Sequence, residues 1–313
     1  MLKNKWLIIS LSVTLLLILG LGVFFGIRAK NKITFTVGDS LPDGGGRVAH
    51  VILLGGQSNA SGCSHDEYLR QNVGEEKYAE YDGGYENVYI NYYVSDHNVS
   101  GEFVRCKTNQ GELGCCFGPE LGMAERLHND YPEEEFFIIK CAWGGTNLFE
   151  QWLSPSSSGK TGDLYKKFAA FVDANIKYLE SKNYDVKIEG MCWMQGESDS
   201  FDENHATGYA DNLTNFIKDI RKSYEKYASD DGIIFVDAYI ADLPSFWVYG
   251  ALVNESKRQV AESDPKNLLI DTISHGLDTT KEPTDQPDIP HYDSMSQIKL
   301  GHLFAAEIGK FID

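Results

Sequence analysis

The chain has 313 residues and a net charge of −18, with 46 acidic residues against 28 Lys and Arg. Because contacts to phosphate need concentrated Lys and Arg, this balance argues against nucleic acid as a partner, and it weakly disfavours strongly anionic polymers as substrates. The roughly 280 residues that follow the first thirty are enough for one α/β domain with long loops.

The first thirty residues differ in character from the rest. An uncharged apolar run extends from Trp6 to Ile27, which is long enough for a bilayer core of about 20 helical residues. Basic residues flank it on both sides: Lys3, Lys5, Arg28, Lys30 and Lys32. We predict a transmembrane signal anchor over 1–30, a linker over 31–47 and an extracytoplasmic domain over 48–313. Cleavage of the first segment would instead give a secreted protein.

Five short runs rich in Ile, Val, Leu and Phe predict the strands. None shows clean polar alternation, which is typical of strands buried on both faces of a parallel sheet. The runs are Val48 to Gly55, Glu135 to Ala142, Lys187 to Met194, Gly232 to Tyr239, and Asn267 to Thr272.

Helical patterns lie between and after these runs, at Pro119 to Asn129, Asp163 to Glu180, Thr207 to Tyr227, Tyr249 to Ser263, and Ser294 to Phe311. The alternation predicts a three-layer α/β/α sandwich around a five-stranded, mostly parallel sheet. Residues 60–117 are predicted to be the main irregular insertion. Its tyrosines either line a sugar cleft or pack within the loop: Tyr78, Tyr81, Tyr85, Tyr89, Tyr92 and Tyr93.

Chemically useful residues follow three of the predicted strands. Ser58 comes after the first, Gly144 and Gly145 after the second, and Gln195 and Glu197 after the third. Ligands bind beyond the carboxyl ends of strands in such sheets. A hydroxyl nucleophile, glycine N–H groups and an amide are the parts needed to attack an acyl carbon and hold the resulting oxyanion. An ordinary helix-capping serine is the alternative interpretation of Ser58.

A candidate base lies just before the last helix. His291 follows Asp288 by three residues, and serine needs a base that an acid holds in one tautomer. Asp285 and Asp293 are rival acids, although Asp293 is better placed to cap the last helix. The other seven histidines are interpreted as structural or surface groups.

The chain has six cysteines, and five of them, all except Cys63, fall into two groups. Cys141 and Cys192 lie inside predicted strands and are expected to be buried thiols. Cys106, Cys115 and Cys116 lie in a glycine-rich segment, where a disulfide of Cys106 with either of the other two suits an extracellular domain. No clustered Cys/His spacing predicts zinc, and we predict no metal site.

Five blocks in chain order resemble those of a known family. They are Gly55-Gly56-Gln57-Ser58-Asn59-Ala60-Ser61-Gly62, Gly118-Pro119-Glu120, Trp143-Gly144-Gly145-Thr146-Asn147-Leu148 with Gln151-Trp152, Gln195-Gly196-Glu197-Ser198-Asp199, and Asp288-x-x-His291. Together they resemble the sialate O-acetylesterase-like branch of the SGNH (GDSL-like) hydrolases, which includes the acetyl xylan esterases of carbohydrate esterase family six. The resemblance spans residues 48–305.

The resemblance implies a flavodoxin-like sandwich and ester hydrolysis through an acyl-serine, without metal or cofactor. It implies that Ser58 is the nucleophile, His291 the base and Asp288 its orienting acid. It implies an oxyanion hole built from the backbone of Ser58 and of Gly144 or Gly145, with the amide of Gln195. Further residues have supporting roles: Gln57, Asn59 and Glu197, the last orienting the histidine or bracing Ser58 and Gln57.

The sequence therefore predicts a membrane-anchored carbohydrate O-acetylesterase. Xylan-like or other acetylated glycans are the expected substrates, and sialic acid acetyl esters come next. One alternative is an esterase or transferase that acts on cell-wall acetyl groups. Another is a catalytically idle, glycan-binding surface protein that keeps the fold.

Overall fold

The computed structural model describes residues 33–312, and the chain from Phe35 onward forms one compact unit. The predicted anchor over 1–30 lies outside the described residues. Within 33–312, no helix is both long enough and apolar enough to cross a membrane.

The central sheet has eight strands in the part of the chain described. The five predicted strands are confirmed as β1 (Val48–Gly56), β7 (Phe136–Ala142), β8 (Asp185–Met194), β9 (Ile234–Ala238) and β10 (Asn267–Ile270). A sixth parallel strand, β3 (Val88–Val94), pairs with β7, and two short antiparallel strands, β4 (Asn98–Val99) and β5 (Val104–Arg105), pair with β3. The order is β10-β9-β8-β1-β7-β3-β4. The α/β class is confirmed, but the predicted five strands are too few.

The segment 60–117 is more regular than the sequence predicted. It contains the second half of the short helix α2 (Ser58–Ser61), the helix α3 (Asp66–Gly83) and the strand β3. It also contains a two-stranded ribbon of β2 (Ser64–His65) and β6 (Cys116–Phe117). The sequence does not predict β3, because three of its seven residues are tyrosines in a segment whose pattern is also typical of an irregular loop.

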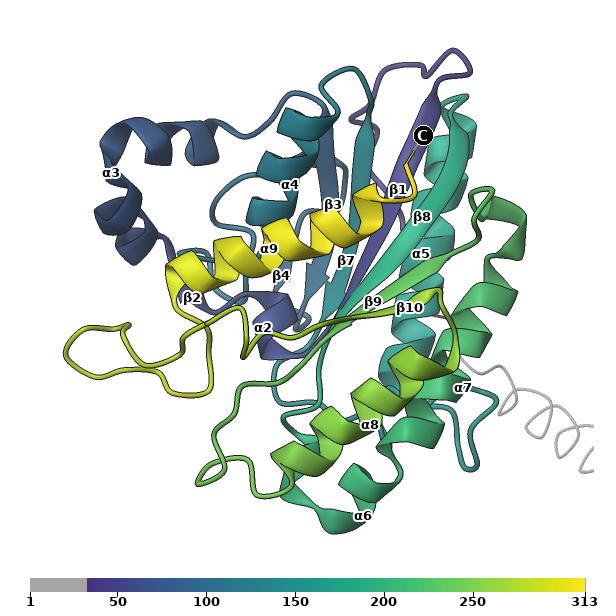
Figure 1. The fold of residues 1–313 in the computed structure, drawn as a ribbon. Helices are drawn as coiled ribbons and strands as arrows, with labels where there is room; N and C mark the ends of the chain where they lie inside the picture. Colours follow the sequence, from purple (N-terminus) through teal and green to yellow (C-terminus); the bar gives the residue numbers. More distant parts are fainter. Residues whose placement is uncertain (1–32, 313) are drawn as a thin grey trace, which may run out of the picture. The chain divides into compact units, whose positions relative to one another are not determined.

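Helices cover both faces of the sheet (Figure 1). On one face α4 (Pro119–Asp130) packs against α9 (Ser294–Gly309). On the other, α5 (Asp163–Ser181) and α7 (Tyr209–Ser223) meet through the rings of Phe168 and Phe216. The helix α8 (Gly250–Ser263) packs against β10 and α7. The predicted helix over 207–227 is wrong in its bounds, because Gly208 separates α7 from α6 (Glu203–Thr207) and residues 225–227 form a 3₁₀ turn.

Two glycines set how closely α4 and α9 approach. A Cβ on Gly122 would lie 2.0 Å from the carbonyl oxygen of Ile298, and one on Gly301 would lie 2.1 Å from that of Pro119. Only a residue without a Cβ permits this backbone contact. The contact fixes α9, which begins directly after the segment that carries His291.

The register of the sheet brings three chain segments to one edge. Gly56, at the end of β1, pairs with Ala142 at the end of β7 and with Met194 at the end of β8. The residues that follow these strands therefore emerge side by side.

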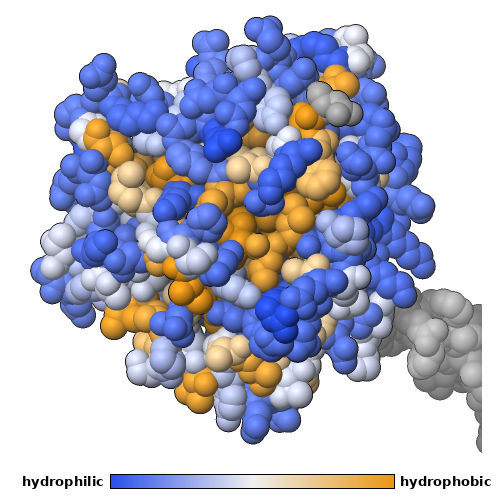
Figure 2. All heavy atoms as spheres, in the orientation of Figure 1, coloured by the Kyte–Doolittle hydropathy of each residue, from blue (hydrophilic) through white to orange (hydrophobic). Residues whose placement is uncertain are grey.

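The side of the molecule seen in Figure 1 has a mostly hydrophilic surface, with an apolar area in its middle between α8 and α9 (Figure 2).

The predicted disulfide is wrong. All six cysteines, which lie within the described residues, are free. Cys106 is buried and its thiol donates to the carbonyl oxygen of Glu120 at 3.3 Å. Cys115 and Cys116 lie instead at the β2–β6 ribbon, so the fold directs these side chains to different places.

Candidate active site

A cavity of about 400 Å³ lies at the carboxyl ends of β1, β7 and β8. It is lined by Gln57, Ser58, Cys63, Glu112, Gly144, Gly145, Ser198, Phe201, Phe246, Trp247, Pro290 and His291. The fold thus brings together the predicted nucleophile, base and glycines from distant parts of the sequence. A larger cavity of about 720 Å³ lies beside Phe149 and α5, but none of the described residues that line it is a histidine, and Ser58 is not among them.

His291 is held by the acid that the sequence predicted. Its Nδ1 lies 2.6 Å from Oδ2 of Asp288, and its backbone N–H donates to the carbonyl oxygen of Asp288 at 3.0 Å. In the described part of the chain, neither Nε2 of His291 nor Oγ of Ser58 has a hydrogen-bond partner. The ring is therefore oriented from one side, and its second nitrogen is free to accept a proton.

The rival acids are engaged elsewhere. Asp285 is exposed and makes no hydrogen bond to His291. Asp293 is the N-cap residue of α9 by position, but its side chain does not cap the helix. Its carboxylate accepts the backbone N–H groups of Lys281 and Glu282 at 3.0 and 2.9 Å, and so orders the loop before the helix. The capping role expected for its side chain is wrong.

Asn59 ties the nucleophile segment to the histidine segment. Its Oδ1 accepts the backbone N–H of Tyr292 at 3.0 Å, and its Nδ2 donates to the carbonyl oxygen of Pro290 at 3.2 Å. The same Nδ2 donates to Oε1 of Glu197 at 2.8 Å. The residues on both sides of His291 are therefore fixed to the residue that follows Ser58.

Two backbone donors are available for an oxyanion. Gly145 is exposed and has φ of +66°, a conformation that favours glycine. Within the described residues, the N–H groups of Gly145 and Ser58 have no acceptor. The N–H of Gly144 donates to Oγ of Ser95, although at 3.4 Å. Gly145 is thus the better donor of the two glycines.

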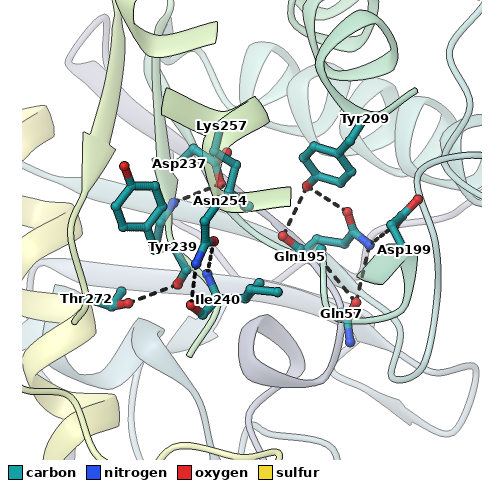
Figure 3. Close-up of polar contacts among 12 residues, drawn as sticks. Gln57, Gln195, Asp199, Tyr209, Asp237, Tyr239, Ile240, Asn254, Lys257 and Thr272 are labelled. Carbon is teal, nitrogen blue, oxygen red and sulfur yellow. Dashed lines mark hydrogen bonds and ion pairs between the residues drawn. The ribbon is translucent and has the colours of Figure 1, made fainter. Parts of the chain in front are cut away.

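Gln195 is not placed to bind an oxyanion, which corrects the sequence prediction. The side chain is fully buried and does not line the cavity. Its Nε2 donates to Oδ2 of Asp199 at 2.6 Å, to the carbonyl oxygen of Thr146 at 2.9 Å and to Oε1 of Gln57 at 3.2 Å (Figure 3). Its Oε1 accepts the hydroxyl of Tyr209 at 2.9 Å. Both amide hydrogens are therefore already used.

Asp199 completes a support for the glycine loop. Its carboxylate accepts the backbone N–H groups of Leu148 and Phe149 at 2.9 and 3.2 Å, as well as the amide of Gln195. Burial raises the pKa of Asp199 to about 6, although these hydrogen bonds act in the opposite direction. Gln195 and Asp199 together hold residues 146–149, and thereby the position of Gly145.

Gln57 offers the amide that Gln195 does not. Its Oε1 accepts the backbone N–H of Ser198 at 3.1 Å in addition to the amide of Gln195. Its Nε2 points away from Gln195 (Figure 3), and Gln57 lines the cavity beside Ser58. In the described structure this nitrogen has no acceptor. The sequence predicts only a supporting role for Gln57, because spacing along the chain does not show where a side chain points.

Glu197 braces Asn59 and not the histidine. Its Oε1 accepts from Asn59, and its Oε2 is buried without a partner among the described residues. Burial raises the pKa of Glu197 above its usual value. The nearby Lys257 is paired with Asp237, whose Oδ1 lies 2.6 Å from its Nζ (Figure 3). Glu197 makes no hydrogen bond to His291.

Three aromatic residues that the sequence analysis missed form one wall of the cavity. The rings of Phe246 and Trp247 have centroids 4.6 Å apart, and those of Phe201 and Trp247 lie 5.2 Å apart. Phe201 is 56% exposed and Phe246 39% exposed, so both offer open ring faces. The adjacent Phe246 and Trp247, just beyond the fourth predicted strand, were the signal that could have found this wall.

The six tyrosines considered for a sugar cleft do not line this cavity. Tyr81 and Tyr85 are buried, and the Tyr81 hydroxyl donates to Glu125 at 2.6 Å. Tyr93 packs edge-on against Trp143 with ring centroids 5.0 Å apart. Packing within the fold is therefore the interpretation that the structure supports.

Two further residues in the wall were not predicted. Glu112 lies beside Gly144, and its Oε2 is buried without a partner in the described structure. Cys63 lies next to the nucleophile, with its Sγ 3.6 Å from the carbonyl oxygen of Ser58. Burial raises the pKa of this thiol well above its usual value, so it stays protonated and is a poor rival nucleophile.

An α/β fold with a serine, an oriented histidine and free N–H donors in one cavity has the parts of a serine ester hydrolase. The sequence profile of the family described as "Carbohydrate esterase, sialic acid-specific acetylesterase" matches residues 48–310, and the chain belongs to this family. The resemblance seen in the sequence is confirmed, and the enzyme class is carboxylic ester hydrolase.

Several individual proteins are similar to this chain. A probable carbohydrate esterase of Arabidopsis thaliana is 28% identical over 109 residues, which cover 34% of this chain and 37% of that protein. The solved structure of an A. thaliana protein has a TM-score of 0.62 and 17% identity, and covers 87% of this chain and 100% of that chain. The structure of NanS has a TM-score of 0.61 and 16% identity, and covers 87% of this chain and 99% of that chain. The structure of a carbohydrate acetylesterase from Xanthomonas citri has a TM-score of 0.53 and 18% identity, and covers 84% of this chain and 56% of that chain. At these identities the structures show a shared fold.

Proposed function

We propose that the protein removes O-acetyl groups from carbohydrates through an acyl-serine intermediate. The observation that carries this proposal is the shared cavity of Ser58 and His291, with Asp288 bound to the opposite nitrogen of the ring. Membership in a family of carbohydrate esterases supports an acetylated sugar as the substrate.

The geometry supports a two-step reaction. Nε2 of His291 takes the proton from Ser58 as Oγ attacks the acetyl carbonyl carbon. The oxyanion is stabilised by the N–H groups of Ser58 and Gly145 and by Nε2 of Gln57. Collapse of the intermediate breaks the ester bond, and the imidazolium gives its proton to the departing sugar oxygen. A water molecule, deprotonated by the same imidazole, then attacks the acyl-serine. Collapse of this second intermediate releases acetate, and the imidazolium returns its proton to Oγ of Ser58.

The lining of the cavity favours neutral glycans over sialic acid esters, although the family name denotes the latter. None of the described residues that line it is Lys or Arg, so no basic side chain among them pairs with the carboxylate of a sialic acid. The carboxylate of Glu112 is also part of the lining, and its negative charge repels an anion. The exposed rings of Phe201 and Phe246 provide faces for stacking on a sugar ring.

The location of the enzyme is also a proposal. The uncharged run from Trp6 to Ile27, between basic flanks, supports a membrane anchor with the catalytic domain outside the cytoplasm. Fractionation of cells that express the full chain tests this. Protein in the membrane fraction, accessible to protease added outside, supports the anchor, whereas a cytosolic protein contradicts it.

Hydrolysis of p-nitrophenyl acetate by the full chain tests the reaction. Ser58→Ala is expected to lower kcat by about 10⁴–10⁶-fold, because the acyl-enzyme no longer forms. Ser181→Ala, at the exposed end of α5, is a control that should keep full activity. Equal activity of Ser58→Ala and the wild type would overturn the mechanism. Glycan binding without any turnover would instead support an idle binding protein.

Release of acetate from polymeric substrates tests the specificity. Acetylated xylan is expected to give a higher kcat/KM than acetylated sialic acid, and Glu112→Gln is expected to narrow the difference. A preference for the sialic acid ester, unchanged in Glu112→Gln, would contradict the electrostatic argument. Acetyl transfer to an added sugar in preference to water would identify a transferase.

A further inference from the structure

A cluster of soft ligand atoms lies behind the active site, at the β2–β6 ribbon. His65 and Cys116 are directly paired across the ribbon, and Cys115 precedes Cys116 in the chain. Pairing across the two strands places the imidazole and the two thiols together, although some fifty residues of sequence separate them. The predicted absence of a metal site rested on sequence spacing, which does not reveal such a pairing.

The distances within the cluster suit a metal ion. The ligand atoms of His65, Cys115 and Cys116 all lie within 4.8 Å of one another. Sγ of Cys115 is 3.9 Å from Nδ1 of His65 and 3.9 Å from Sγ of Cys116. In tetrahedral zinc, bonds of about 2.3 Å to sulfur and about 2.0–2.1 Å to nitrogen place the ligand atoms about 3.6–3.8 Å apart. The two distances from Cys115 exceed these values by a few tenths of an ångström, and the third, between His65 and Cys116, is within 4.8 Å, so movements of up to about 1 Å would complete the geometry.

We propose that His65, Cys115 and Cys116 bind one thiophilic divalent cation, with Zn²⁺ the best match. Thiolate and imidazole ligands select zinc over magnesium or calcium, and three protein ligands leave a fourth position for water. The inference does not depend on the proposed function.

The residue next to His65 supports a cation at this place. Asp66 is buried, and its Oδ1 has no hydrogen-bond partner in the described structure. Its backbone N–H donates to the carbonyl oxygen of Cys115 at 3.0 Å, so the main chain of Asp66 adjoins the cluster. Buried carboxylates are normally paired, and a neighbouring cation would provide the missing positive charge.

The site is connected to the histidine segment. Oγ of Ser64 donates to the carbonyl oxygen of Tyr292 at 2.6 Å. Ser64 and His65 also line a small cavity together with Asp288 and His291. A cation that fixes the ribbon would therefore also restrain the segment that carries the base. Binding is expected to stabilise the folded protein, with a rise in Tm of about 5 °C at a hundredfold excess over Kd.

Titration of the untagged full chain in detergent, reduced and freed of metal, tests the proposal. The probe is Cd²⁺, whose thiolate complexes absorb in the ultraviolet. The wild type is expected to bind one equivalent with a Cd–thiolate absorption, and Zn²⁺ should displace it. His65→Ala and Cys115→Ser, both at accessible positions, should each weaken binding by tenfold or more. Cys106→Ser is the matched control and should bind like the wild type, because its hydroxyl can still donate to Glu120.

Three outcomes would overturn the site. One is the absence of saturable binding at one equivalent. A second is unchanged affinity in both His65→Ala and Cys115→Ser. The third is binding that depends on the cysteines but not on His65, which would show that the two thiols bind the cation without the imidazole. Cys116→Ser is read only together with its circular dichroism spectrum, because Cys116 is buried.

Discussion

Replacement of Asn59 by Ala tests whether the base is positioned by the residue beside the nucleophile. The side chain makes three hydrogen bonds, to the backbone of Pro290, to the backbone of Tyr292 and to Glu197. Alanine removes all three without adding bulk. Because two of them hold the residues on either side of His291, the change is expected to release the segment that carries the base.

The size of the effect follows from the burial of the partners. Tyr292 and Glu197 are buried, so the N–H of one and the carboxyl of the other lose a partner. A buried polar group left unpaired costs about 1–3 kcal/mol, which gives a loss of about 2–6 kcal/mol for the two. At about 2–4 °C per kcal/mol for a chain of this size, that loss lowers Tm by about 4–24 °C. A displacement of His291 by about 1 Å lowers kcat by about 10²-fold.

The assay compares kcat, KM and Tm for p-nitrophenyl acetate hydrolysis. Asn87→Ala is a matched control, because Asn87 also makes three hydrogen bonds, to His128, Tyr131 and Glu134. Asn87 directly precedes β3, at the edge of the sheet opposite the cavity. Asn87→Ala should therefore lose a similar amount of stability and keep its kcat, whereas Asn59→Ala should lose both.

If the kcat of Asn59→Ala stayed within twofold of the wild-type value, the proposed positioning of His291 by Asn59 would be refuted. It would also be refuted if Asn87→Ala lowered kcat as much as Asn59→Ala does, since the loss would then follow stability alone.

Three further substitutions address single groups. Asp288→Asn should lower kcat by about 10³–10⁴-fold, because Asp288 orients His291. The unfolding free energy should change little, because the side chain is half-exposed. Equal kcat values for Asp288→Asn and the wild type would exclude the orienting role. Gln57→Glu keeps the acceptor oxygen but removes the free Nε2 donor, and should lower kcat by about 10²–10³-fold; unchanged turnover would remove Gln57 from the oxyanion hole. Burial raises the pKa of Glu197, so the wild type loses stability as pH rises above the unfolded-state pKa of this carboxyl and the buried group ionises. Glu197→Gln has no such group, so its Tm relative to that of the wild type should increase from about pH 5 to pH 8. A difference in Tm that stays constant with pH would contradict the raised pKa.

The sequence by itself determined the strands and the order of the motifs. Apolar runs without polar alternation identified five of the six parallel strands, because burial on both faces leaves a local signature. Asp288 and His291 were recognisable as a pair because three residues separate them in the sequence, and a short segment fixes their contact. Ser58 was recognisable from its place directly after the first strand.

Only the tertiary structure decided which side chains reach the cavity. Gln195 and Gln57 are both glutamines that follow buried strands, yet the amide of one is consumed by Asp199 and Thr146 while that of the other stays free. The pairing of His65 with Cys116 was equally invisible, because antiparallel register joins segments far apart in the sequence. Periodicity records whether a residue is buried. The direction of a side chain and the partners it finds depend on long-range contacts, which the linear pattern does not contain.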